Sequence, residues 1–164
     1  VMSCITAKGR EGIDRFTVGK QAFSAELEFS IGTVAGTDDC LWGFRKVEAL
    51  NATVDNYDEM AALNVISGNI NIETILNNAA TTTTDTTANW ADGEIHALKV
   101  IVSKAGAVTY KIDGLAPSTT AAFSFDQGEV VTPFFHQLQA SGLTGLLILR
   151  KLTIVESDNG SMEV

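Results

Sequence analysis

The chain has 164 residues, of which 45% are hydrophobic and 19% are charged, and its formal net charge is −9. That length suits one domain with a continuous core, and no apolar run approaches the roughly 20 residues that a membrane-spanning helix needs. The basic residues are few and scattered, so we expect neither nucleic acid nor a membrane as a partner. The first residues show no charged segment followed by an apolar one, and no secretory signal is predicted.

The N-terminal part predicts several strands. Apolar residues at 4–7 and 16–18 predict an edge strand and a hairpin arm. From 23 to 31 every second residue is apolar, and the residues between them are Ser or Glu, which predicts a strand with one face in the core. Residues 41–46 predict a further strand that is rich in aromatic side chains.

The middle of the chain predicts a hairpin and a threonine-rich strand. No clear pattern runs through 48–60, and we leave it unassigned. Residues 63–66 and 69–76 flank a Ser-Gly pair and predict a hairpin with isoleucines on its buried side and asparagine amides on the other. The threonine run at 79–88 favours a strand over a disordered linker, because threonine is β-branched.

A second hairpin is predicted between Trp90 and Gly114. The side chains expected to face one another across it are Leu98, Val100 and Val102 on the first strand and Val108, Tyr110 and Ile112 on the second. Further strands are predicted at 121–125 and at 132–139, with Pro133 at the start of a strand.

Residues 146–155 predict the last strand. Its core candidates are Leu147, Leu149, Leu152 and Ile154, whose spacing shifts at Arg150-Lys151, where a bulge is expected. No segment has the spacing of a helix of ordinary length, so many short strands point to a sandwich or a barrel.

The predicted hairpin resembles the central hairpin of laminin-G-like and concanavalin A-like lectin domains. The residues that carry the resemblance are Trp90, Gly93, His96, Gly106, Tyr110, Asp113 and Gly114. The resemblance covers 20–156 and implies an all-β jelly-roll sandwich of two antiparallel sheets. We therefore expect an N-terminal arm and edge strand at 1–19, the sandwich domain at 20–156 and a polar tail at 157–164.

The family also implies where metal ions or catalytic acids would lie. The metal-binding cluster of legume-type members has no counterpart here. Glycoside hydrolases of this fold carry three acids on one strand, whereas here Glu26 and Glu28 are followed by Ser30. These departures predict that the chain is not an enzyme, that it holds no cofactor or metal, and that Glu26 and Glu28 lie on a solvated face.

The histidines and cysteines give no catalytic or metal-binding pattern. His96 and His136 are the only histidines, and no GxSxG motif accompanies them. We expect His96 to be a hydrogen-bonded structural residue. Cys4 and Cys40 lack CxxC spacing and are expected to be free and buried, the alternative being one bridge between them.

Aromatic and acidic side chains supply the remaining candidates. Trp90, Tyr57 and Trp42 are the residues on which a sugar could stack, although aromatic residues on strands more often belong to the core. Loop carboxylates that could bind calcium, but which we expect to be solubilising turn residues, are Asp38, Asp39, Asp55, Asp58 and Asp85.

Three functions follow from these observations. The first is a non-enzymatic structural or adhesive protein, such as a capsid decoration or tail protein of a virion, whose partners are other subunits of an assembly or copies of itself. Its location would then be a virion or an extracellular surface. The second is a carbohydrate-binding, lectin-like module with a glycan as partner. A glycoside hydrolase or lyase ranks last.

Overall fold

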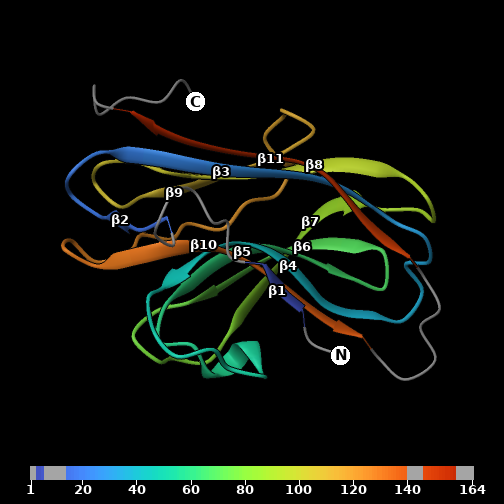
Figure 1. The fold of residues 1–164 in the computed structure, drawn as a ribbon, viewed down its shortest axis with the longest axis horizontal. Helices are drawn as coiled ribbons and strands as arrows, with labels where there is room; N and C mark the ends of the chain where they lie inside the picture. The colour runs from blue at the N-terminus through green and yellow to red at the C-terminus, as the bar shows by residue number, and fades with distance from the viewer. Residues whose placement is uncertain (1–2, 6–13, 140–145, 158–164) are drawn as a thin grey trace.

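The computed structural model describes residues 3–5, 14–139 and 146–157. In these residues the chain forms two stacked antiparallel sheets (Figure 1). The seven-stranded sheet has the order β1-β10-β4-β5-β6-β7, with β2 also paired to β10, and the four-stranded sheet has the order β11-β3-β8-β9. This arrangement confirms the predicted jelly-roll sandwich. The predicted tail at 157–164, apart from Ser157 at the end of β11, and much of the predicted arm at 1–19 lie outside the described residues.

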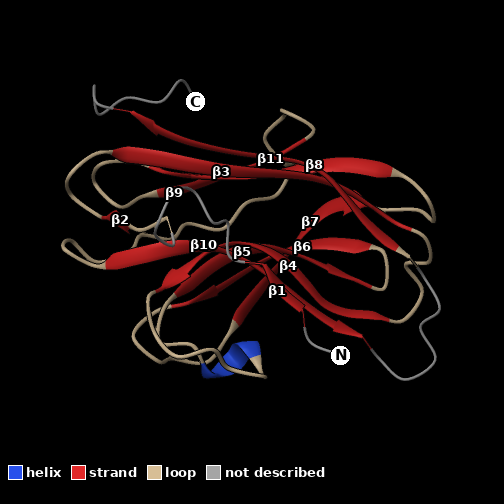
Figure 2. Cartoon of the chain, viewed as in Figure 1, coloured by secondary structure: helices blue, strands red, loops and turns tan. Residues whose placement is uncertain are grey.

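The elements follow one another along the chain with mostly short connections. Their bounds are β1 Ser3–Ile5, β2 Phe16–Thr17, β3 Ala22–Ile31, β4 Thr37–Lys46, the 3₁₀ helix η1 Val54–Asn56, β5 Met60–Ile66, β6 Asn69–Ile75, β7 Thr82–Asn89, β8 Ile95–Val102, β9 Val108–Ile112, β10 Val130–Gln139 and β11 Leu147–Ser157. Figure 2 shows that, apart from η1, the described residues form strands and loops.

The two sheets bury their facing sides against each other. Phe29 of β3 lies at the centre of this core, with its ring centroid 4.6 Å from that of Trp90 and 5.8 Å from that of Phe135. All three side chains are buried. Burying an aromatic side chain of this kind stabilises a fold by roughly 2 kcal/mol, so this cluster is a main contribution to holding the sheets together.

Both predicted hairpins form. β8 and β9 pair in the expected register, with Val100 opposite Tyr110. β5 and β6 are joined by Ser67 and Gly68, whose φ angles are 48° and 85°, as the tight turn of a two-residue hairpin requires. The threonine run forms β7, and the register shift near Arg150 in β11 is the predicted bulge.

Two predictions for the C-terminal half are wrong. Pro133 lies inside β10 rather than at the start of a strand. β4 pairs with β10 on one side, while on the other side β2 pairs with its first residues and β1 with later ones. Pro133 falls between those two partners, where its missing N–H is not needed. Residues 121–125 form no strand, and only an isolated bridge between Ala107 and Ser124 marks their approach to the four-stranded sheet.

The outer face of the seven-stranded sheet, which points away from the four-stranded sheet, carries a second apolar cluster. Its members are Leu41, Val54, Tyr57, Met60, Ala62, Ile75 and Phe134. Val54 and Tyr57 come from the loop between β4 and β5, and Figure 1 shows η1 of that loop beneath the sheet. The loop therefore folds back over part of the outer face.

Candidate functional site

Beside this apolar cluster, the outer face of the seven-stranded sheet is polar. The register places Asn64 of β5 opposite Asn71 of β6, and Asn71 opposite Asp85 of β7. Glu73 of β6 lies opposite Thr83 of β7. We define the polar patch as these side chains together with the neighbouring Asp39 of β4, that is, Asp39, Asn64, Asn71, Glu73, Thr83 and Asp85.

Asn64 lies at the centre of the polar patch and is fully buried. Its Nδ2 donates a hydrogen bond to Asp39 Oδ1 at 3.3 Å, and its side chain also hydrogen-bonds Glu73. Its Oδ1 is buried and has no partner. A buried acceptor without a partner costs about 1–3 kcal/mol, so this oxygen offsets part of the stability that the hydrogen bonds of Asn64 contribute.

The two carboxyl groups beside Asn64 are easier to protonate than usual. Burial raises the pKa of Glu73, an effect that the hydrogen bond from Asn64 reduces and that Asp39 and Asp55 increase. Burial likewise raises the pKa of Asp39, and the neighbouring Asp38 adds to this increase. The charged forms of both groups are therefore disfavoured, which suits contact with an uncharged polar ligand better than with another anion.

The accessible side of the polar patch lies along β7, where Thr83 and Asp85 are exposed. Thr83 Oγ1 donates to Glu73 Oε1 at 3.4 Å, and Asp85 Oδ1 accepts from the backbone N–H of Thr87 at 2.8 Å. Asn69, at the start of β6 and opposite Asn89, adds another exposed amide beyond Asn71. The result is a surface of hydroxyl, amide and carboxyl groups that can both donate and accept hydrogen bonds.

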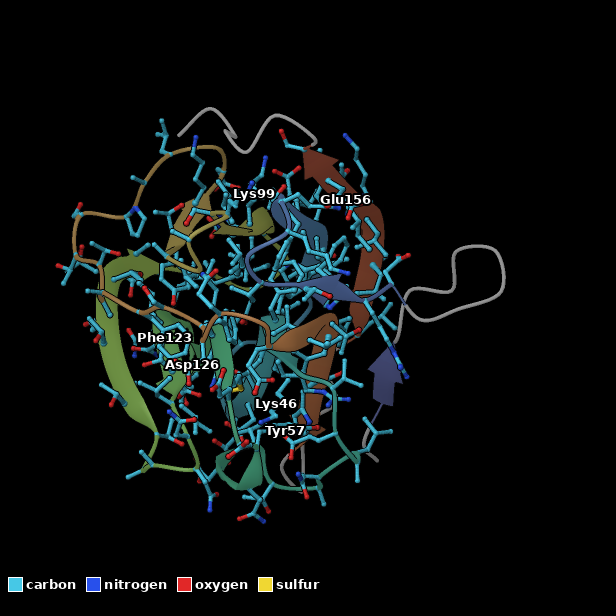
Figure 3. The ribbon with its side chains drawn as sticks, turned by 90° about the vertical axis from the view of Figure 1, so that its left-hand side faces the viewer. Lys46, Tyr57, Lys99, Phe123, Asp126 and Glu156 are labelled. Atoms are coloured by element: carbon cyan, nitrogen blue, oxygen red, sulfur yellow. The ribbon has the colours of Figure 1, made fainter. Side chains whose placement is uncertain are left out.

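Arg45, on the same face, and the next residue of β4, Lys46, are both engaged elsewhere. The guanidinium carbon of Arg45 lies 4.8 Å from the centroid of the Tyr57 ring, and its Nη1 donates to main-chain carbonyl groups. Lys46 Nζ lies 2.6 Å from Asp58 Oδ2 and 2.8 Å from Glu129 Oε1. Figure 3 shows Lys46 and Tyr57 at the same end of the large sheet.

His136 of β10 lies on the same row of the seven-stranded sheet as Asn64, with Leu41 of β4 between them. Its side chain is buried, its Nε2 has no hydrogen-bond partner, and burial lowers its pKa. The imidazole is therefore neutral at pH 7 and keeps a nitrogen that could accept or donate a proton.

The predicted stacking residues do not lie on an accessible surface. Trp42 and Trp90 are 2% exposed and belong to the core between the sheets, and Tyr57 is 1% exposed against the outer face. This burial speaks against the prediction that a sugar stacks on them, although Trp42 borders a cavity of about 210 Å³ with Leu27 and Phe135. Trp90 is buried because its indole packs against Phe29, and its Nε1 donates to the carbonyl of Glu94.

Glu26 and Glu28 lie on the outer face of the four-stranded sheet, as the alternation of β3 predicts. The register places Glu26 opposite Lys99 of β8, and Glu28 opposite Lys151 of β11. Figure 3 shows Lys99 on the layer opposite Lys46. Each acid thus lies opposite a lysine of a neighbouring strand, on the other side of the molecule from the polar patch.

His96 is the structural, hydrogen-bonded histidine that the sequence predicts. Its Nδ1 lies 2.6 Å from Asp113 Oδ2 and its Nε2 lies 3.1 Å from Glu94 Oε2. Burial by itself lowers the pKa of His96, but the hydrogen bonds to Asp113 and Glu94 outweigh it, so the pKa is raised. Because Asp113 Oδ1 also accepts from the backbone N–H of Ala97, the cluster ties the end of β9 to β8.

Metal binding and cysteine chemistry receive little support from the geometry. In the part of the chain that the structure describes, no group of three or more His, Cys, Asp or Glu side chains is placed to hold a metal ion. Cys40 is free and buried, and burial raises its pKa to about 12. The side chain of Cys4 lies outside the described residues. None of the described helices is long and apolar enough to cross a bilayer.

The sequence alone did not identify the polar patch as a site. The asparagines that alternate with isoleucines in β6 were its only visible signal. Asp39, Asn64 and Glu73 come from three strands and meet only through cross-strand pairing. The unpaired state of Asn64 Oδ1 depends on those neighbours, which no local pattern contains.

Neither a protein-family model nor a curated protein matches the sequence. Solved structures share its fold. An alginate lyase from Pseudomonas aeruginosa has a TM-score of 0.59 at 12% identity, over 87% of this chain and 68% of the lyase chain. A carbohydrate-binding module from Bacillus subtilis has a TM-score of 0.50 at 12% identity, over 84% of this chain and 76% of the module. The potassium-bound carbohydrate recognition domain of Emp46p has a TM-score of 0.61 at 12% identity, over 86% and 74% of the two chains.

At such low identity these similarities show the fold alone, which is the concanavalin A-like jelly roll. The chain spans 68% and 66% of two of the alginate lyases, those from Pseudomonas aeruginosa and Zobellia galactanivorans. The prediction that the chain is not an enzyme is contradicted, because several of the structures that share this fold are alginate lyases. Nothing in the comparisons supports the virion role or the laminin-G side of the resemblance.

Proposed function

We propose that the chain is a carbohydrate-binding domain and that its glycan lies on the polar patch of the seven-stranded sheet. The observation that carries this proposal is the accessible side of the polar patch, where the exposed Thr83 and Asp85 lie beside Glu73, whose carboxyl pKa is raised by burial. A sugar hydroxyl can donate to one of these groups while it accepts from another. The fold shared with a carbohydrate-binding module and a carbohydrate recognition domain supports the same proposal.

The charge of the polar patch favours a neutral polysaccharide. Its ionisable side chains are the carboxyl groups of Asp39, Glu73 and Asp85, and Arg45, on the same face, is buried beneath Tyr57. The whole chain carries a net charge of −9. A polyanion would therefore meet like charge both at the site and at long range, whereas a neutral chain of hydroxyl groups would not.

Affinity electrophoresis against a panel of neutral and anionic polysaccharides tests this proposal. We expect retardation by at least one neutral polysaccharide, weakened in T83A and D85N, which change exposed groups of the polar patch. T82A is the matched control, because Thr82 is an exposed neighbour on β7 whose side chain points to the opposite face. Retardation that is unchanged in T83A and D85N would place the glycan elsewhere, and no retardation by any neutral polysaccharide would refute the proposal.

A second candidate function is cleavage of a polysaccharide. It is favoured by His136, which lies on the row of Asn64 with a free ring nitrogen and a lowered pKa and so could act as a base, and by the lyases that share the fold. Elimination at a uronic acid would make an unsaturated product whose ultraviolet absorbance can be followed. Activity on a polyuronate that is lost in H136A would establish this candidate. Absence of the product from all polyuronates tested would exclude it.

A further inference from the structure

β9 forms one edge of the four-stranded sheet, and its register shows which backbone groups face outward. The N–H of Val108 donates to the carbonyl of Phe123, and the N–H of Ile112 donates to the carbonyl of Leu115, so neither points toward β8. In an antiparallel pair the hydrogen-bonding direction alternates from one residue to the next. The N–H and C=O of Tyr110, midway between Val108 and Ile112, must therefore also point to the open edge.

The segment that follows β9 closes this edge at both ends but not in the middle. It pairs with β9 through Leu115 next to Ile112 and through Phe123 next to Val108. The labelled Phe123 in Figure 3 marks the far end of this segment. Between the two contacts the segment bows away, and no backbone hydrogen bond from it reaches Tyr110. The N–H and C=O of Tyr110 are thus left open in a short gap, next to the C=O of Val108.

A cavity of about 350 Å³ lies at this gap. One wall is apolar and consists of Leu115, Ala116 and Pro117, and Leu115 is 74% exposed. Thr109, Thr120 and Lys111 also line the cavity. The side chain of Tyr110 packs in the core between the sheets, so Tyr110 borders the cavity with its backbone.

We propose that this edge cavity binds one pyranose residue of a neutral glycan through a pair of adjacent hydroxyl groups. In an extended strand the N–H and C=O of one residue point the same way and lie side by side. One hydroxyl accepts from the N–H of Tyr110, and its neighbour on the ring donates to the carbonyl of Tyr110. The apolar wall of Leu115, Ala116 and Pro117 packs against the C–H groups of the ring, as in other small-molecule sites with few polar anchors.

The length of the gap favours a sugar over a peptide. A peptide that adds to a sheet edge gains affinity from a run of backbone hydrogen bonds. Here the edge offers the N–H and C=O of Tyr110 and the C=O of Val108, because Leu115 pairs with both groups of Ile112 and Phe123 accepts from the N–H of Val108. The site lies on the other sheet from the polar patch, so each of the two proposals can fail without the other.

Two-dimensional NMR of the ¹⁵N-labelled chain, titrated with methyl glucopyranoside, tests the edge cavity. We expect the amide proton of Tyr110 to shift downfield and to saturate, and a per-O-methylated glucoside to give no such shift. T120W should weaken binding about tenfold or more by filling the cavity, and A116W should do the same from the other wall. T119W is the matched control, because Thr119 is equally exposed but does not line the cavity.

Three results would overturn the proposal. The first is a Tyr110 amide that does not move at saturating glucoside. The second is binding that T120W and A116W leave unchanged while both variants keep the thermal unfolding midpoint of T119W. The third is a Tyr110 shift produced by a capped dipeptide at lower concentration than by the glucoside, which would make the cavity a peptide site.

Discussion

Replacing Asn64 by alanine tests the geometry of the polar patch directly. The change removes hydrogen bonds to two carboxyl groups, Asp39 and Glu73, and each such bond to a charged group contributes about 1.5 kcal/mol at the lower end of its range. It also removes the unpaired Oδ1, whose burial costs about 1 kcal/mol. We therefore expect the free energy of unfolding at pH 7 to fall by about 2 kcal/mol.

The loss should depend on pH. Burial raises the pKa values of Asp39 and Glu73 above their unfolded values, so each group costs stability as pH rises through the folded pKa. Asn64 opposes that increase in both groups, and in N64A the pKa values rise further. The deficit should therefore shrink as the pH is lowered to about 4, because protonation of both carboxyl groups removes the charge that the hydrogen bonds of Asn64 stabilise.

Urea unfolding followed by tryptophan fluorescence at both pH values measures these differences. N71A is the matched control, because the side chain of Asn71 donates to the main-chain carbonyl of Asn69 at 3.3 Å, whereas that of Asn64 donates to a carboxyl group. Its deficit should be the same at both pH values. An N64A deficit that is absent at pH 7, or that does not change with pH, would refute the arrangement of Asn64 between the two acids.

Three further predictions concern other parts of the sandwich. G43A should lower the free energy of unfolding by about 3 kcal/mol, because an added Cβ would lie 2.2 Å from the carbonyl oxygen of Ala61 on β5. A denaturant titration measures this loss, and an unchanged midpoint would contradict the close approach. E59Q should stabilise the protein by about 1–3 kcal/mol at pH 8 and by little at pH 5. The buried Glu59 carboxyl has no hydrogen-bond partner, and burial, with nearby acids, raises its pKa to about 7, so its charged form costs stability only at the higher pH. Equal effects at both pH values would count against this. D113N should lower the free energy of unfolding by roughly 1 kcal/mol at pH 5 and by less at pH 9. The ion pair with Asp113 raises the pKa of His96, and the stability that it gives at low pH disappears as the pH rises through that pKa. Thermal melts with the opposite trend would exclude the ion pair.

The parts of the fold that the sequence predicts are those with local, alternating signals. The hairpin around Val100 and Tyr110 has one buried and one solvated face, so a single register satisfies every apolar side chain. The turn at Ser67–Gly68 supplies the positive φ angles that this hairpin needs. The loop between β4 and β5 could not be predicted in the same way, because Tyr57 is buried by folding back onto a sheet face that is already apolar.

The polar patch and the edge cavity were hidden for a related reason. Asp39 and Glu73 are separated along the chain and meet at Asn64 only after β4, β5 and β6 pair. The gap beside Tyr110 depends on where the following segment leaves β9 and rejoins it, and residues 121–125 have the composition of a strand without forming one. Both sites are created by pairing between strands and not by any residue's own pattern.

The most direct test of the central claim is to map a bound neutral oligosaccharide by NMR, with the side-chain amides of Asn64 and Asn71 as reporters on the outer face of the seven-stranded sheet. The claim predicts that both side-chain amide signals, and backbone signals of β5, β6 and β7, shift and saturate together as the oligosaccharide is added. Shifts confined to the four-stranded sheet, or saturation of binding with both asparagine signals unmoved, would contradict it.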